Sequence, residues 1–187
     1  MAGHALIVID VQQGFDDPCW GTRNNPECEH NVAKLVDRWE LAGQPVVVVR
    51  HDSREPGSPL RPDQPGNQLK EFVRERGDVL VSKSVHSAFH GRPDLDDWLR
   101  AHDVDAVAIC GITTNHCCET TARVGCDLGY RVTFVTDATA TFDRRSPSGS
   151  WISADQLAES TFANLNEEFA EILDTAALLR RLTASAD

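Results

Sequence analysis

The chain has 187 residues, of which 41% are hydrophobic and 25% charged, the balance of a globular protein. Its formal charge is −11, from 18 basic against 29 acidic side chains, which disfavours nucleic-acid and anionic-membrane partners because both need a basic face. No apolar run reaches the roughly 18 residues of a membrane span, and the start of the chain lacks the basic leader of a signal peptide. We therefore expect one cytoplasmic domain over residues 1–187.

The six cysteines predict reduced thiols and no disulfide framework. They stand at positions 19, 28, 110, 117, 118 and 126, and no Cys-x-x-Cys pair occurs. In a chain of this size without a leader, this usage is typical of a reducing compartment. The cysteines and histidines are irregularly spaced, so we expect no structural zinc site.

Short β-rich runs alternate with amphipathic segments along the chain. The run "ALIVID" is nearly unbroken and apolar, as in a strand covered on both faces, whereas Val32, Leu35 and Trp39 recur at helical spacing. In chain order the pattern predicts strand 5–10, helix 29–43, strand 45–51, strand 78–83, helix 93–103, strand 104–110, helix 116–130, strand 131–138, helix 153–168, strand 169–173 and helix 174–182. This alternation predicts a three-layer α/β/α Rossmann-like fold around a mostly parallel six-stranded sheet.

Three chemically able side chains stand at or just past the ends of predicted strands. Asp10 ends "ALIVID", Lys83 ends "DVLVSK", and Cys117 follows the strand 104–110 and a short turn. Ligands of open parallel sheets bind at the carboxyl ends of the strands, so the three side chains are expected to converge. Each alone has an ordinary structural explanation, as a turn carboxylate, a solvated lysine or a packed cysteine. Their shared placement favours a catalytic site.

The chemistry of these three groups is that of acyl transfer. A thiol attacks only as thiolate, and we expect the helix N-terminus and Lys83 to stabilise that anion. Asp10 could take the thiol proton and return it to a leaving amine. Backbone N–H groups in the first turn of the helix could hold the oxyanion. The neighbouring Cys118 is rotated by about 100° around the helix axis, and we expect it to pack against the sheet.

At these residues the sequence resembles the isochorismatase-like cysteine hydrolases, a superfamily that includes nicotinamidases and N-carbamoylsarcosine amidohydrolases. The resemblance lies in "LIVIDVQQGF", "VSKSVHSAFHGRPDLDDWL" and "VAICGITTNHCCETTARVGCDLGYRVTFVTDATAT", and it covers nearly the whole chain. It implies Asp10 as general base, Lys83 as the middle member of a triad, and Cys117 as nucleophile. It also implies a cis peptide bond between Ile112 and Thr113, which would join the Thr113 N–H to that of Cys117 in an oxyanion hole.

The resemblance does not extend to a metal site. Nicotinamidases of this superfamily bind a metal through an Asp-x-His pattern after the second strand and a further histidine. This chain reads "RHDSREPGS" there, so Asp52 has no histidine two residues on, and we predict no catalytic metal. His51 and Asp52 are interpreted as shaping the pocket or holding the loop 52–68, which is rich in Pro, Gly, Ser and Asp.

The substrate pocket is expected to be formed by Phe15, Trp20, His86 and Phe89 together with the loop 52–68. True isochorismatases cleave a vinyl ether and lack the cysteine, so Cys117 favours an amide or ureido substrate.

We therefore expect a cysteine hydrolase that cleaves a C–N bond of a small amide, ureido or carbamoyl compound. No organic cofactor is expected, because neither GxGxxG nor GxxxxGK[ST] occurs. The resemblance implies a homo-oligomer, either a dimer or a tetramer. Three alternatives stay open: vinyl ether hydrolysis of the isochorismatase type, a thiol redox or sensing protein that uses Cys117 and Cys118, and an inactive module that binds a small ligand.

Overall fold

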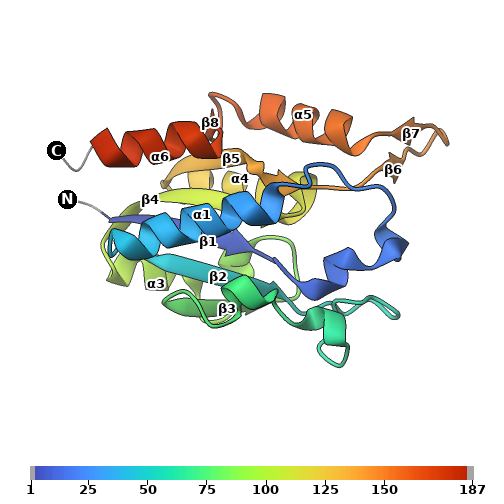
Figure 1. The fold of residues 1–187 in the computed structure, drawn as a ribbon, viewed down its shortest axis with the longest axis horizontal. Coiled ribbons are helices and arrows are strands. Elements are labelled where there is room, and N and C mark those ends of the chain that lie inside the picture. The colour runs from blue at the N-terminus through green and yellow to red at the C-terminus, as the bar shows by residue number, and fades with distance from the viewer. Residues whose placement is uncertain (1–2, 185–187) are drawn as a thin grey trace.

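A six-stranded sheet forms the centre of the molecule in the computed structural model, which describes residues 3–184 (Figure 1). The strand order is β3-β2-β1-β4-β5-β8, and all neighbouring strands of this sheet are parallel. The strands are β1 (Gly3–Ile9), β2 (Val46–His51), β3 (Val79–Lys83), β4 (Val104–Ile112), β5 (Arg131–Ala140) and β8 (Glu171–Leu173). The predicted three-layer α/β fold is thus confirmed, with a sheet that is parallel throughout.

Helices cover both faces of the sheet. The helices α1 (Cys28–Leu41), α2 (Glu71–Arg74) and α6 (Thr175–Ala184) lie on one face, and α3 (Leu95–Ala101), α4 (Glu119–Asp127) and α5 (Ala154–Leu165) lie on the other. Side chains of β1 alternate between the two cores: Leu6 and Val8 pack with α1, whereas Ile7 and Ile9 pack with α3. This alternation explains the unbroken apolar run, because both faces of the strand are buried.

Some elements differ from the sequence-based expectation. The expected helix 116–130 begins with a π-helical turn, Thr114–Cys118, and continues as α4. The expected strand 169–173 is reduced to the three residues of β8, and the strands β4 and β5 extend two residues farther than expected. The helix α2 and the hairpin of β6 (Arg144–Arg145) and β7 (Trp151–Ile152) were not expected. A helix of four residues and strands of two residues are too short to leave a periodic pattern in the sequence.

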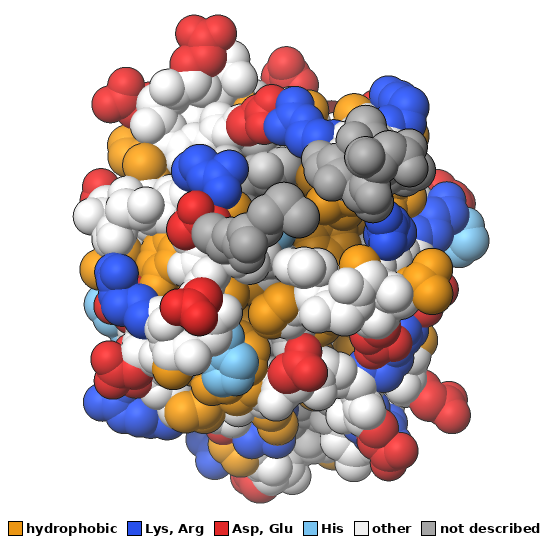
Figure 2. Space-filling model, turned by 90° about the vertical axis from the view of Figure 1, so that its left-hand side faces the viewer, with side chains coloured by type: hydrophobic (Ala, Val, Ile, Leu, Met, Phe, Trp, Pro, Cys, Tyr) orange, Lys and Arg blue, Asp and Glu red, His pale blue; other side chains and the backbone are white. Residues whose placement is uncertain are grey.

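The two ends of the sheet differ in what covers them. At the carboxyl ends of the strands lie the β6–β7 hairpin, the segment before α1 and the loop 52–68 (Figure 1). The opposite end, where β1 begins, carries acidic and basic side chains intermixed with apolar ones (Figure 2). Within residues 3–184, no helix is both long and apolar enough to cross a membrane.

Candidate active site

Asp10, Lys83 and Cys117 converge at the carboxyl ends of the strands. Asp10 follows β1 directly with a positive φ of 52°, Lys83 is the last residue of β3, and Cys117 lies in the π-helical turn after β4. Lys83 Nζ donates to Asp10 Oδ2 at 2.6 Å and to Cys117 Sγ at 3.3 Å. The side chains of Asp10 and Lys83 are fully buried, so each charge depends on the other for compensation.

His51 completes the surroundings of the Lys83 ammonium. It ends β2, where it pairs in register with Lys83, and its Nδ1 lies 3.2 Å from Lys83 Nζ. An ammonium has only donors, so Nδ1 must be the acceptor in this contact. Burial and then the Lys83 charge lower the pKa of His51, which favours the neutral ring that this contact requires. The three N–H groups of Lys83 therefore have three partners: a carboxylate, an imidazole and a sulfur.

The surroundings raise the pKa values of both Lys83 and Cys117. Burial alone would lower the pKa of Lys83, but the Asp10 carboxylate and the Cys117 sulfur raise it above its usual value. Burial, and after it the Asp10 carboxylate, raises the pKa of Cys117 to about 12 despite the opposing effect of Lys83. Lys83 thus stabilises the Cys117 thiolate in the direction expected, but burial and the Asp10 carboxylate outweigh it. With its pKa raised to about 12, the Cys117 sulfur is a thiol at neutral pH, and it lies beside the Lys83 ammonium.

One carboxylate oxygen of this pair is available to accept a proton. Asp10 Oδ1 is buried and has no hydrogen-bond partner among the described residues, whereas Oδ2 accepts from Lys83. One oxygen of Asp10, one ring nitrogen of His51 and the sulfur of Cys117 all lie within 4.8 Å of one another. A buried acceptor this close to a thiol can serve as its general base.

The turn between β4 and Cys117 has an unusual backbone. The peptide bond between Ile112 and Thr113 is cis, and Gly111 before it has a φ of 123°. A Cβ at Gly111 would lie 2.0 Å from the carbonyl oxygen of Ile9, so only glycine allows β4 to approach β1 this closely here. Thr113 lines the same cavity as Cys117.

The cavity above Cys117 has a volume of about 510 Å³, a size suited to a small molecule. Phe15, Trp20 and His86 line it, as expected. Phe15 and Trp20 form an apolar wall together with Phe142, and their ring centroids are 5.2 to 6.1 Å apart.

Phe89 does not belong to this cavity, which corrects the expectation for that residue. It is buried in the core beneath α4, where its ring stacks on Tyr130 with centroids 5.7 Å apart. Gly125 of α4 leaves the space for it, since a Cβ there would lie 3.1 Å from the Phe89 ring. The aromatic ring thus fills the gap between the helix and the sheet and does not face the substrate.

Two buried amides attach the loop 52–68 to the site. Gln12 Nε2 donates to the carbonyls of His51 and Asn67 at 3.0 and 2.8 Å, and its Oε1 accepts from the His51 N–H at 2.8 Å. Asn67 Nδ2 donates to Asp52 Oδ1 at 3.0 Å and to the Leu60 carbonyl at 2.9 Å. His51 lines the cavity and Asp52 does not, so Asp52 contacts the loop and His51 the site.

Sequence reasoning missed several residues of the cavity wall, among them His116, Phe142 and Arg144. His116 directly precedes the nucleophile candidate, and the other two follow the end of β5. The rule that led to Asp10 and Lys83, applied to the carboxyl end of β5, would have pointed to them.

Comparisons with known proteins identify the family of this chain. The isochorismatase domain model matches residues 4–177. The chain belongs to the isochorismatase family. It is 37% identical to the uncharacterized isochorismatase family protein YrdC of Bacillus subtilis, over 94% of each chain. It is 34% identical to Nicotinamidase 3 of Arabidopsis thaliana, over 95% of this chain and 88% of that one. An isochorismatase-family structure from Chromobacterium violaceum superposes with a TM-score of 0.91 at 36% identity, covering 97% and 94% of the two chains.

The metal site of nicotinamidases in the isochorismatase family does not fit the residues present here. Asp52 is ion-paired with Arg50, with Nε 2.9 Å from Oδ1, and Arg54 stands where the pattern has histidine. Within residues 3–184, Asp10, His51 and Cys117 also bring potential metal-ligating atoms close together. Each of those residues already contacts the Lys83 ammonium, whose charge would repel a metal cation.

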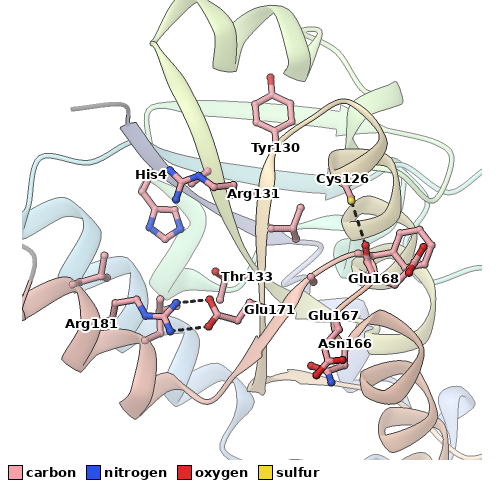
Figure 3. A pocket seen from close by; sticks show the side chains of 16 residues that line it. His4, Cys126, Tyr130, Arg131, Thr133, Asn166, Glu167, Glu168, Glu171 and Arg181 are labelled. Atoms are coloured by element: carbon pink, nitrogen blue, oxygen red, sulfur yellow. Dashed lines mark hydrogen bonds and ion pairs between the residues drawn. The ribbon is translucent and has the colours of Figure 1, made fainter.

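A second hollow, of about 610 Å³, lies on another part of this isochorismatase-family chain (Figure 3). His4 and Arg131 line it, and both lie at the start of their strands. Glu171 and Arg181 point toward one another across it and form an ion pair (Figure 3). It contains no counterpart of the Asp10–Lys83–Cys117 arrangement, so the cavity above Cys117 is the candidate active site.

Proposed function

We propose that this chain is a cysteine hydrolase that cleaves a C–N bond of a small amide, ureido or carbamoyl compound through a covalent intermediate on Cys117. One observation supports this most: a single buried ammonium, Lys83 Nζ, lies within hydrogen-bond distance of both the Asp10 carboxylate and the Cys117 sulfur. The relatives named nicotinamidase and streptothricin hydrolase support hydrolysis of an amide.

The first half of the proposed reaction forms the covalent intermediate. Asp10 Oδ1 takes the thiol proton as Cys117 Sγ attacks the substrate carbonyl carbon, and the Lys83 ammonium stabilises the negative charge that develops on sulfur. The N–H groups of Thr113 and Cys117 receive the carbonyl oxygen as it becomes an oxyanion. Asp10 then gives its proton to the leaving nitrogen, the C–N bond breaks, and ammonia or an amine departs.

The second half releases the product. Asp10, again a carboxylate, takes a proton from a water that attacks the thioester or thiocarbamate carbon. The C–S bond breaks, and the proton on Asp10 returns to the Cys117 sulfur. The raised pKa of Cys117 fits this cycle, because a thiol that is protonated at rest needs a base at the moment of attack and is a good proton acceptor at the end.

The test is a screen of primary amides, ureido acids and carbamoyl compounds, followed by tandem mass spectrometry of the intact enzyme and its peptides. We expect an acyl or carbamoyl adduct on Cys117 that is lost in Cys117→Ser. The matched control is Cys118→Ser, because Cys118 is the adjacent thiol but is fully buried in the core at the start of α4. That variant should keep the adduct and the turnover.

Other outcomes would point to the alternatives. Turnover of a vinyl ether that survives Cys117→Ala would indicate isochorismatase-type chemistry. A Cys117–Cys118 disulfide that forms with mild oxidant, without turnover of any compound, would indicate a redox protein. Ligand binding with neither turnover nor adduct would indicate a binding module.

A further inference from the structure

Arg144 is a charged side chain on the wall of the catalytic cavity that has no part in the chemistry proposed above. It lines the same cavity as Asp10 and Cys117. Among residues 3–184 its guanidinium has no ion pair and no hydrogen bond, although nine of the fifteen arginines form ion pairs within this part of the chain. Arg144 is an exposed residue of the cavity wall, so its guanidinium is accessible to a ligand that enters the cavity.

The backbone that carries Arg144 is held in place. Arg144 pairs with Ile152 in the antiparallel β6–β7 hairpin. At its base, the Asp143 N–H donates to the Thr22 carbonyl at 2.8 Å, and Asp143 Oδ1 accepts from the Ala154 N–H at 2.7 Å. Successive strand residues point to opposite faces. The next residue, Arg145, accordingly donates to the Gly149 carbonyl at 3.1 Å and does not line the cavity.

Among the described residues that line the cavity, Arg144 is a cation whose charge no ion pair neutralises. Asp10 and Lys83 neutralise one another. Burial, followed by the nearby Arg144 charge, lowers the pKa of His116 to about 4, so this ring is neutral at pH 7. Glu55, on the exposed loop 52–68, lines the cavity as well, but no ion pair joins it to Arg144.

We infer that Arg144 binds a carboxylate at the end of the substrate remote from the scissile C–N bond, so that the substrate is an amide, ureido or carbamoyl acid. This inference rests on the proposed function. A guanidinium presents two parallel N–H donors that match the two oxygens of a carboxylate, and one arginine balances its single negative charge. A phosphate dianion would keep an uncompensated charge, so the cavity suits the carboxylate better. The neutral Phe15, Trp20 and Phe142 wall would contact the apolar carbons between the two ends.

The kinetic test uses matched pairs of substrates that differ only in charge. The acids are succinamate, glutaramate and adipamate, and each is compared with the amide in which a methyl ketone replaces the carboxylate. For the acids, we expect Arg144→Gln to lower kcat/KM by about 10- to 100-fold, the usual effect of losing a charge-assisted hydrogen-bond pair. For the amides that carry a methyl ketone, kcat/KM should change by less than about twofold in the same variant. The matched control Arg145→Gln, on the other face of the same hairpin, should leave both series unchanged.

A binding measurement makes the inference testable without turnover. In the Cys117→Ser background, calorimetry with the same three acids should give affinities that fall about tenfold or more when Arg144→Gln is added. The role of Arg144 would be overturned if Arg144→Gln lowered kcat/KM equally for the acids and for the methyl-ketone amides, or if none of the three acids bound. If the wild type hydrolyses the methyl-ketone amides through a Cys117 adduct and does not favour the acids, the hydrolase proposal stands and the carboxylate inference fails. If no compound is hydrolysed but the acids bind through Arg144, the carboxylate inference stands and the hydrolase proposal fails.

Discussion

The Asp10 carboxylate and the Lys83 ammonium lie 2.6 Å apart with both side chains fully buried, although 73 residues separate them in the chain. Removing such a pair from water costs free energy, and removing one partner leaves the other charge buried alone. The pair is therefore both a catalytic candidate and a determinant of stability, and the two roles can be separated by mutation.

Lys83→Met should destabilise the fold by about 3–5 kcal/mol, because it leaves the Asp10 carboxylate buried without its cation. Asp10→Asn combined with Lys83→Met should recover much of that loss, since no isolated charge remains. Neither variant should hydrolyse substrate. Urea denaturation followed by tryptophan fluorescence measures the stabilities, and a double variant as unstable as the sum of the single ones would contradict this account.

The reactivity of Cys117 should change in opposite directions in two assays when Asp10 becomes Asn. The pKa of Cys117 is raised to about 12, first by burial and then by the Asp10 carboxylate. Removing that negative charge lowers the pKa, so at pH 8–9 alkylation by iodoacetamide should be faster in Asp10→Asn than in the wild type. Hydrolysis should be lost because the proton acceptor is gone.

Site-resolved mass spectrometry measures this alkylation, with the half-buried Cys126, which lines the other hollow, as an internal reference whose rate should not change. In the wild type, the rate at Cys117 should still rise with pH up to the highest pH at which the protein stays folded. A plateau near neutral pH would mean that the thiolate is already formed at rest, contrary to the proposed role of Asp10.

The buried Gln12 amide should control the order of the loop 52–68. Gln12→Leu removes the side-chain partners of the His51 N–H and of the Asn67 carbonyl, whereas the His51 carbonyl keeps the hydrogen bond from Asn67 Nδ2 at 3.1 Å. Leaving such buried groups unpaired costs about 1–3 kcal/mol each. We expect faster tryptic cleavage after Arg54 in the loop and a higher KM. The exposed Gln64, changed to Leu, is the control, and equal cleavage rates in the two variants would argue against the Gln12 contacts.

Gly111→Ala should prevent stable folding or lower stability by more than about 3 kcal/mol, because its Cβ would meet the Ile9 carbonyl oxygen at 2.0 Å. Gly129→Ala is the matched control. Gly129 also has a positive φ, 93°, but a Cβ there would meet nothing within 4 Å, so only the backbone cost of about 1–2 kcal/mol is expected. Thermal unfolding of both variants separates the steric effect from the conformational one.

The sequence predicted the six strands of the main sheet, with carboxyl ends correct to within two residues, and with them the meeting of Asp10, Lys83 and Cys117. That success has a simple cause: in a parallel sheet, the end of each strand fixes where its next side chain lies. The contact of His51 with Lys83 could not be predicted, because it depends on the register between β2 and β3. Phe89 was misplaced because an aromatic residue six positions beyond a strand end can face either the cavity or the core, and the space left by Gly125 decides between them.

The ammonium and the sulfur come from strands at different distances from the sheet centre: β3 is an edge strand, and β2 and β1 separate it from β4. Lys83 reaches Cys117 only if three neighbouring strand pairs have all formed in the correct alignment. A partly folded chain whose edge strand has not yet docked would keep most of its core but have no cation at the nucleophile. Recovery of activity during refolding should therefore lag behind burial of the core. On mild denaturation, the initial loss of activity should coincide with detachment of β3.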